Sequence, residues 1–85
     1  MPRLPRTETE FDGFRWQLQI DVQTQLVEVW RSRFRGLDMG LLVEVAVCFW
    51  NGEHLALRES CAGGDALSPR HMRDLSQVVH TILAS

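Results

Sequence analysis

The chain has 85 residues and a mass of 9.8 kDa, which is the size of one domain and leaves no room for a second independent core. Hydrophobic residues make up 45% of the chain and charged residues 24%, a composition that excludes a disordered chain, a collagen-like repeat and a disulfide-rich miniprotein. The formal net charge of −2 gives the whole molecule no electrostatic attraction to nucleic acid or to an anionic membrane.

Targeting and redox signals are weak in this sequence. No apolar run approaches the roughly 18 residues of a membrane span, and the first residues have no apolar signal-peptide core, so we expect a cytoplasmic protein with no membrane partner. Cys48 and Cys61 are separated by a spacing that matches neither a zinc site nor a secreted disulfide framework. We therefore interpret both as reduced thiols and expect no metal and no cofactor.

Residues 1–13 have the features of a flexible N-terminal tail. They contain two prolines, then alternating Thr and Glu at positions 7–10, and end in the turn signal Phe11-Asp12-Gly13. We place a single α+β domain at residues 14–85. Its first element is a strand near residues 14–22, where apolar and polar residues alternate with a period of two.

The segment 26–35 fits either a helix or a strand. As a strand, its second half alternates well, but Val27 and Val29 fall on the opposite parity and no Gly, Pro or Asn marks a preceding turn. As a helix, Asp21 would be the N-cap and Gly36 the C-terminal stop, although Val, Thr and Trp are mediocre helix formers. The sequence leaves both alternatives open.

A β-hairpin is predicted at residues 41–50 and 53–60, because two strand-like runs flank the turn signal Asn51-Gly52. A two-residue loop would set Glu44 opposite Glu59, and like charges across a ladder are destabilising. We therefore favour a three-residue loop 50–52, which sets Glu44 opposite Arg58 and Cys48 opposite His54. This register gathers the apolar side chains of one face: Val43, Val45, Val47, Phe49, Leu55 and Leu57.

The last predicted element is a helix near residues 68–84. Ser68 is a typical N-cap, and Pro69 suits the first helical position. One apolar stripe follows at helical spacing: Met72, Leu75, Val78, Val79, Ile82 and Leu83. The predicted fold is therefore a small antiparallel sheet covered by a C-terminal helix.

Two features are candidate partner-binding sites. Arg31, Arg33 and Arg35 form the only concentrated positive patch, and on a strand they would make a one-faced row suited to phosphates or to an acidic protein. Trp50 and Asn51 fall at the predicted hairpin tip, where an exposed tryptophan would be a contact residue.

Catalytic and metal chemistry have little support in the sequence. Cys61 lies shortly before the last helix and His71 lies in its first turn, which is a possible thiol–imidazole pair, but no third group at a recognisable spacing would orient it. The three histidines do not form a close pair of the kind that metal sites use. We expect no catalytic residues.

These observations predict a non-enzymatic protein-interaction module, an inhibitor, adaptor or chaperone-like regulator, comparable at fold level with small bacterial or phage regulators. We expect a homodimer formed through the second face of the hairpin or through the strand near 14–22. The alternative is a nucleic-acid-binding regulator that uses the Arg31, Arg33 and Arg35 cluster. A thiol enzyme using Cys61 and His71 comes third.

Overall fold

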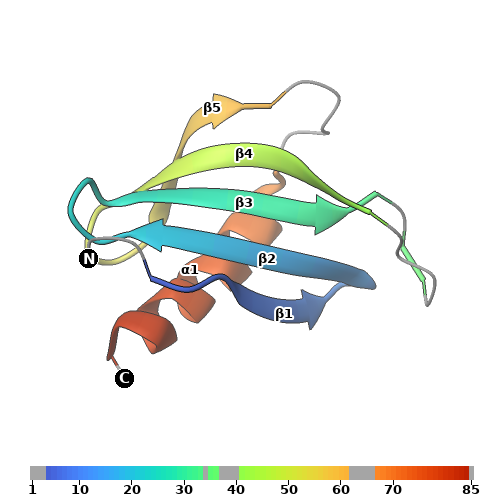
Figure 1. Ribbon diagram of the computed structural model, residues 1–85, viewed down its shortest axis with the longest axis horizontal. Helices are drawn as coiled ribbons and strands as arrows, with labels where there is room; N and C mark the ends of the chain where they lie inside the picture. The colour runs from blue at the N-terminus through green and yellow to red at the C-terminus, as the bar shows by residue number, and fades with distance from the viewer. Residues whose placement is uncertain (1–3, 34, 37–40, 62–66, 85) are drawn as a thin grey trace.

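The strands pair in chain order to form one antiparallel sheet, which a single helix crosses on one face (Figure 1). The computed structural model describes residues 4–33, 35–36, 41–61 and 67–84. The elements are β1 Thr7–Phe11, β2 Phe14–Asp21, β3 Leu26–Ser32, β4 Leu42–Trp50, β5 Leu55–Ser60 and α1 Pro69–Ala84. The predicted α+β fold is confirmed, with an open sheet in the order β1-β2-β3-β4-β5.

The expected N-terminal tail is corrected at residues 7–11, which form β1. Its threonines face inward, where Thr9 lies opposite Trp16, and its glutamates face outward. The turn Asp12-Gly13 has positive φ angles of 54° and 77°, as the tight turn of a β-hairpin requires. The Thr and Glu residues at positions 7–10 predicted a tail because they are polar. A strand at the edge of a sheet, however, needs few apolar residues. Residues 1–3 lie outside the described part of the chain.

Residues Leu26–Ser32 of the segment 26–35 form the strand β3, and the helix alternative is wrong. The Asp21 carboxylate accepts hydrogen bonds from the backbone N–H groups of Gln23 (3.0 Å) and Thr24 (3.2 Å), so it anchors a turn where a helix N-cap was considered. Gln25 completes this turn with a φ of 63°. The four-residue turn sets Val27 opposite Ile20, which removes the parity conflict. Residue 34 is not among the described residues.

The predicted hairpin is confirmed, but its predicted register is wrong. Trp50 pairs with Leu55, so the loop is residues 51–54 and Cys48 lies opposite Leu57 instead of His54. The Asn51 side-chain oxygen accepts hydrogen bonds from the backbone N–H groups of Glu53 (2.8 Å) and His54 (2.9 Å), which stabilises the longer loop.

The face of β4 that is buried also differs from the prediction, because β3 sets the buried Val29 and Val27 opposite Ala46 and Cys48. Ala46, Cys48 and Trp50 are in the core, whereas Phe49 and Leu57 are 37% and 47% exposed. The predicted pairing of Glu44 with Arg58 does not form either. Arg58 lies at an irregularity of the β4–β5 ladder, and Glu44 lies opposite Trp30 of β3.

This arrangement covers part of each expected dimer surface. Strand β2 is flanked by β1 and β3, so the strand near 14–22 has no open edge. Ala46 and Cys48, assigned to the second face of the hairpin, have no exposed area. The edges of the described sheet are β1 and β5.

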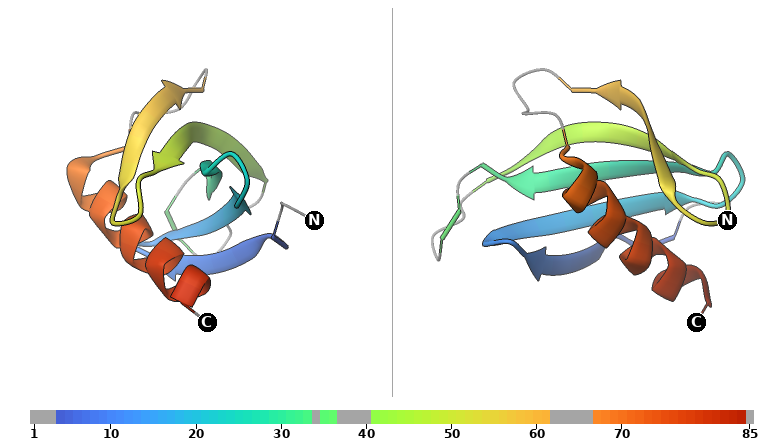
Figure 2. Two further views of the ribbon diagram at one scale, coloured as in Figure 1. Left: turned by 90° about the vertical axis from the view of Figure 1, so that its left-hand side faces the viewer. Right: turned by 180° about the vertical axis from the view of Figure 1, so that it is seen from behind.

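Helix α1 forms as predicted and packs most of the expected stripe against the sheet, whereas Leu83 is 38% exposed. Ser68 is the N-cap, since its hydroxyl oxygen accepts a hydrogen bond from the His71 backbone N–H at 3.1 Å. Leu75 and Val79 have no exposed area. The helix crosses the sheet diagonally, and its C-terminal turns pass the β1 edge (Figure 2). Within the described residues, no helix combines the length and the apolar character that crossing a membrane would need.

Candidate functional site

Two grooves flank α1, one on each side of the helix. The larger groove, of about 490 Å³, lies between α1 and the β4–β5 loop and has a polar lining that includes Glu53, His54, Arg73 and His80. The second groove, of about 420 Å³, lies between α1 and residues 7–9 of β1, and we call it the edge groove. The two grooves differ in what they offer a partner: the edge groove is lined by three residues of the edge strand β1, whereas the larger groove touches the edge strand β5 only at Leu55.

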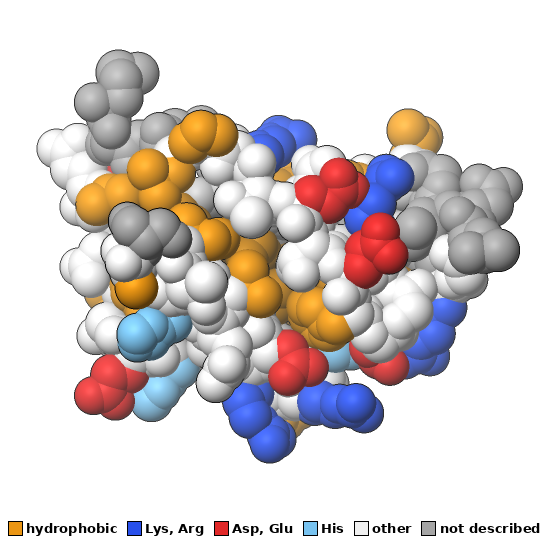
Figure 3. Space-filling model, turned by 90° about the horizontal axis from the view of Figure 1, so that it is seen from below, with side chains coloured by type: hydrophobic (Ala, Val, Ile, Leu, Met, Phe, Trp, Pro, Cys, Tyr) orange, Lys and Arg blue, Asp and Glu red, His pale blue; other side chains and the backbone are white. Residues whose placement is uncertain are grey.

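The edge groove combines apolar helix residues with an open strand edge. Its helix side is formed by four residues on one side of α1: Gln77, Val78, Thr81 and Ile82. Val78 and Ile82 are partly buried and pack against the core on their inner side. Viewed from below, hydrophobic side chains form a diagonal band across the surface on which α1 passes the sheet (Figure 3).

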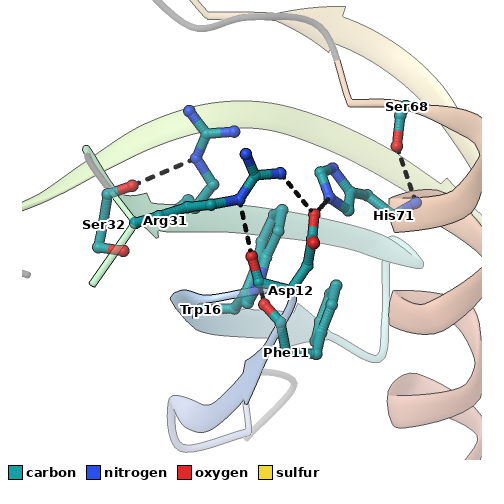
Figure 4. A network of polar contacts seen from close by, with 8 residues as sticks. Phe11, Asp12, Trp16, Arg31, Ser32, Ser68 and His71 are labelled. Carbon is teal, nitrogen blue, oxygen red and sulfur yellow. Dashed lines mark hydrogen bonds and ion pairs between the residues drawn. The ribbon is translucent and has the colours of Figure 1, made fainter. Parts of the chain in front are cut away.

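A cluster around Asp12 fixes the other end of α1 (Figure 4). The Asp12 carboxylate oxygen Oδ2 accepts a hydrogen bond from Arg35 Nη2 at 2.9 Å and lies 2.8 Å from His71 Nε2. Arg35 Nε also donates to the Asp12 backbone oxygen at 3.0 Å. The cluster therefore joins the β1–β2 turn, the chain after β3 and the first turn of α1.

Aromatic rings enclose this cluster on the inner side. Phe11 and Trp16 stack with ring centroids 4.7 Å apart, and the His71 ring meets Trp16 edge to face at 5.0 Å. Trp16 Nε1 donates a hydrogen bond to the Phe11 backbone oxygen at 3.2 Å, so its polar group is satisfied although its side chain is buried. These contacts fix the orientation of α1 on the sheet, in which the C-terminal turns of the helix reach the β1 edge.

The charge of Asp12 is stabilised by its neighbours. Hydrogen bonds from His71, and then from Arg35, lower the pKa of Asp12 from 3.8 to about 2. An ionised carboxylate only accepts hydrogen bonds, so His71 Nε2 carries the proton in this contact. These contacts hold the first turn of α1 against the β1–β2 turn.

The lowered pKa of Asp12 predicts a pH-dependent contribution to stability. Asp12→Asn is expected to be less stable than the wild type at pH 7, and the difference should shrink as the pH falls from about 4 through 2. The reason is that a carboxyl with a depressed folded-state pKa stabilises the fold above its unfolded pKa and loses this effect once protonated. Urea unfolding of both proteins across this pH range measures it.

Glu10→Gln is the matched control for this prediction, because it removes an exposed β1 carboxylate for which no hydrogen bond to α1 is described. It should change stability little at either pH. A destabilisation by Asp12→Asn that stays constant down to pH 2 would contradict the assigned role of the charge.

The arginine cluster predicted from the sequence is not an exposed row. Arg31 is only 9% exposed, with its guanidinium 4.3 Å above the Phe14 ring and its Nε donating to the Ser32 backbone oxygen at 3.2 Å. Arg35 folds back onto Asp12. Only Arg33 of the three is exposed without a described contact to the sheet. Of the three arginines, only Arg31 belongs to β3, and it lies on the inner face.

The predicted exposure of Trp50 is wrong. Trp50 ends β4 and is 7% exposed, and its backbone N–H donates to the Gln25 oxygen at 2.8 Å. Asn51 is exposed, but its side chain stabilises its own loop. The half-buried tryptophan is Trp30, which lies on the sheet face opposite α1 under the Arg6 guanidinium at 4.1 Å.

The structure does not bring Cys61 and His71 together. Among the described residues no contact joins them, because Cys61 follows β5 and donates its backbone N–H to Val45, whereas His71 faces Asp12. Burial, followed by the charges of Glu44, Glu59 and Glu28, raises the pKa of the Cys61 thiol. A raised pKa disfavours the thiolate that a nucleophile needs.

Metal ligands are not gathered in the described residues, where no group of three or more His, Cys, Asp or Glu side chains has a suitable arrangement. Comparison with protein-family models, with curated proteins and with solved structures finds no match to this chain.

The sequence did not point to the edge groove. Two signals were present: the period of two at residues 7–10, and Val78 and Ile82 at one side of the apolar stripe. Only the pairing of β1 with β2 places them side by side.

Proposed function

We propose that the protein is a non-enzymatic interaction module that binds a partner protein in the edge groove. The observation that carries this proposal is the passage of α1 beyond the β1 edge, which leaves a groove of about 420 Å³ lined by Val78 and Ile82 (Figure 2). A segment of a partner protein could pack apolar side chains against the helix residues of this groove. Its main-chain groups could form hydrogen bonds with the open edge of β1.

The cluster around Asp12 supports the same proposal. It holds the first turn of α1 rigidly on the β1–β2 turn, through the 2.8 Å contact between Asp12 and His71. Because the helix is fixed there, its far end keeps its position relative to β1. A groove whose two walls are held in this way loses little conformational entropy on binding.

Photo-crosslinking in the native host tests this proposal. A photoreactive residue at Glu8, in the edge strand beside the groove, is expected to form an adduct with one partner protein. The matched control has the same residue at His54, in the groove on the other side of α1, and should not form that adduct.

Recombinant partner should then bind the purified wild-type chain and lose at least tenfold in affinity for Thr9→Arg, because the bulkier charged side chain enters the groove. Adducts from His54 alone, or no adduct from Glu8, would contradict the proposal.

A further inference from the structure

We infer that the partner contributes an extended segment with alternating apolar and basic residues, which pairs with β1 as a sixth strand. This inference rests on the proposed function and specifies the chemistry of its ligand. Strand β1 is an edge of the sheet, so main-chain groups on its outer side have no strand to pair with in the described chain.

The position of α1 favours a strand at this edge. A paired strand would lie about 4.7–4.9 Å beyond β1 and would continue the sheet over the C-terminal turns of the helix. These turns already pass the edge, and the edge groove is the space between them and residues 7–9 (Figure 2). Every second side chain of the added strand would point toward Val78 and Ile82, which explains the apolar positions.

The charges of β1 explain the basic positions. Glu8 and Glu10 point to the opposite face, where Arg15 is the only basic residue of β2. Arg15 lies 3.0 Å from Glu8 and opposite Glu10 in the ladder, and the Arg6 guanidinium on the same face lies over Trp30 of β3 at 4.1 Å, away from the open edge. The two carboxylates of the edge strand therefore share the Arg15 guanidinium. Lys or Arg at the outward positions of the added strand would meet this excess.

The same charges disfavour a second copy of the chain at this edge. Residues opposite each other in an antiparallel pair point to the same face, so two β1 strands would set glutamates against glutamates. The threonines of the two copies would face each other on the inner side and bury only their methyl groups. The favoured occupant is therefore a basic segment of a different protein.

Synthetic peptides test this inference with the full-length protein. The probe is an acetylated and amidated peptide Thr-Val-Lys-Val-Lys-Val-Thr, and the matched control replaces both lysines with glutamate. The lysine peptide is expected to shift the backbone amide resonances of Thr7–Phe11 and to slow their hydrogen exchange. It should bind roughly three- to tenfold more tightly than the glutamate peptide, with a preference that weakens in high salt. Glu10→Lys should reduce or reverse that preference.

Backbone methylation separates strand pairing from adsorption to the surface. N-methylation at alternate residues whose amides face β1 should abolish binding, whereas N-methylation at the intervening residues should leave it. Equal binding of the two methylated peptides, equal binding of the lysine and glutamate peptides, or shifts confined to β5 would each overturn the inference. So would a β1-linked dimer of the free protein in sedimentation experiments.

If the peptides do not bind, the crosslinking experiment still decides whether the proposed function holds. If the partner crosslinked from Glu8 binds the edge groove while the lysine peptide does not, the module binds a protein there by another mode. If no partner is captured from Glu8, the proposed function itself fails.

Discussion

Replacing Trp16 with alanine is expected to lower the free energy of unfolding by about 3–5 kcal/mol, the largest effect of any substitution considered for this domain. The side chain has no exposed area, stacks on Phe11 and meets the ring of His71 edge to face. Removing this side chain leaves a cavity between β1, β2 and α1, because the paired strands cannot move far enough to fill the space. A chain of 85 residues has a total stability of about 4–13 kcal/mol, so the variant should be marginally folded.

Trp30→Ala is the matched control for the same change of side chain. Trp30 lies half-buried on the opposite face of the sheet and contacts Arg6, so its replacement should cost only about 1 kcal/mol. Urea unfolding followed by circular dichroism compares the two variants. Equal losses for Trp16→Ala and Trp30→Ala would show that the core is not where the structure places it.

Ser76→Ala is expected to destabilise the domain by about 1–3 kcal/mol, although it removes one oxygen atom only. The Ser76 hydroxyl accepts a hydrogen bond from the Leu55 backbone N–H at 2.9 Å and donates to the Met72 oxygen at 2.7 Å. The hydrogen bond between Leu55 and Ser76 joins α1 to the β4–β5 hairpin. Alanine would leave the buried Leu55 N–H without its partner, and burying an unsatisfied donor is costly.

Thr81→Ala provides the comparison, because Thr81 also donates to the carbonyl four residues earlier, at 3.0 Å, but lies exposed on α1. This variant should change stability by less than about 0.5 kcal/mol. Amide hydrogen exchange at Leu55 should accelerate in Ser76→Ala and stay unchanged in Thr81→Ala. An unchanged rate at Leu55 in Ser76→Ala would mean that the hydroxyl does not protect that amide.

The failure of the predicted hairpin register shows how a local electrostatic rule can be overridden. Avoiding Glu44 opposite Glu59 was a sound criterion, but a loop of residues 51–54 also avoids it, and Asn51 stabilises that loop with two hydrogen bonds. The pairing of β4 with β3, in which Cys48 lies opposite the buried Val27, puts Trp50 and not Phe49 on the buried face. Trp50, which was predicted to be an exposed contact residue, therefore lies in the core.

The three arginines do not form the expected one-faced row for a related reason. Alternation in a strand places Arg31 on one face but does not say which face is inward. Pairing with β2 sets Arg31 opposite Trp16, and the aromatic rings of Phe14 and Trp16 accept its guanidinium. A buried arginine of this kind has the sequence signature of a surface arginine.

The sequence by itself determined the strand near 14–22, the existence of the hairpin and the C-terminal helix, because periodicity, the Asn-Gly turn and the Ser-Pro cap are local signals. Only the tertiary structure decided the edge groove, the Asp12–His71 contact between residues 59 positions apart, and the buried state of Arg31 and Trp50. These features depend on which strands pair and in which register. Register is fixed by long-range contacts and by turn length, and a shift of one residue exchanges the buried and exposed faces.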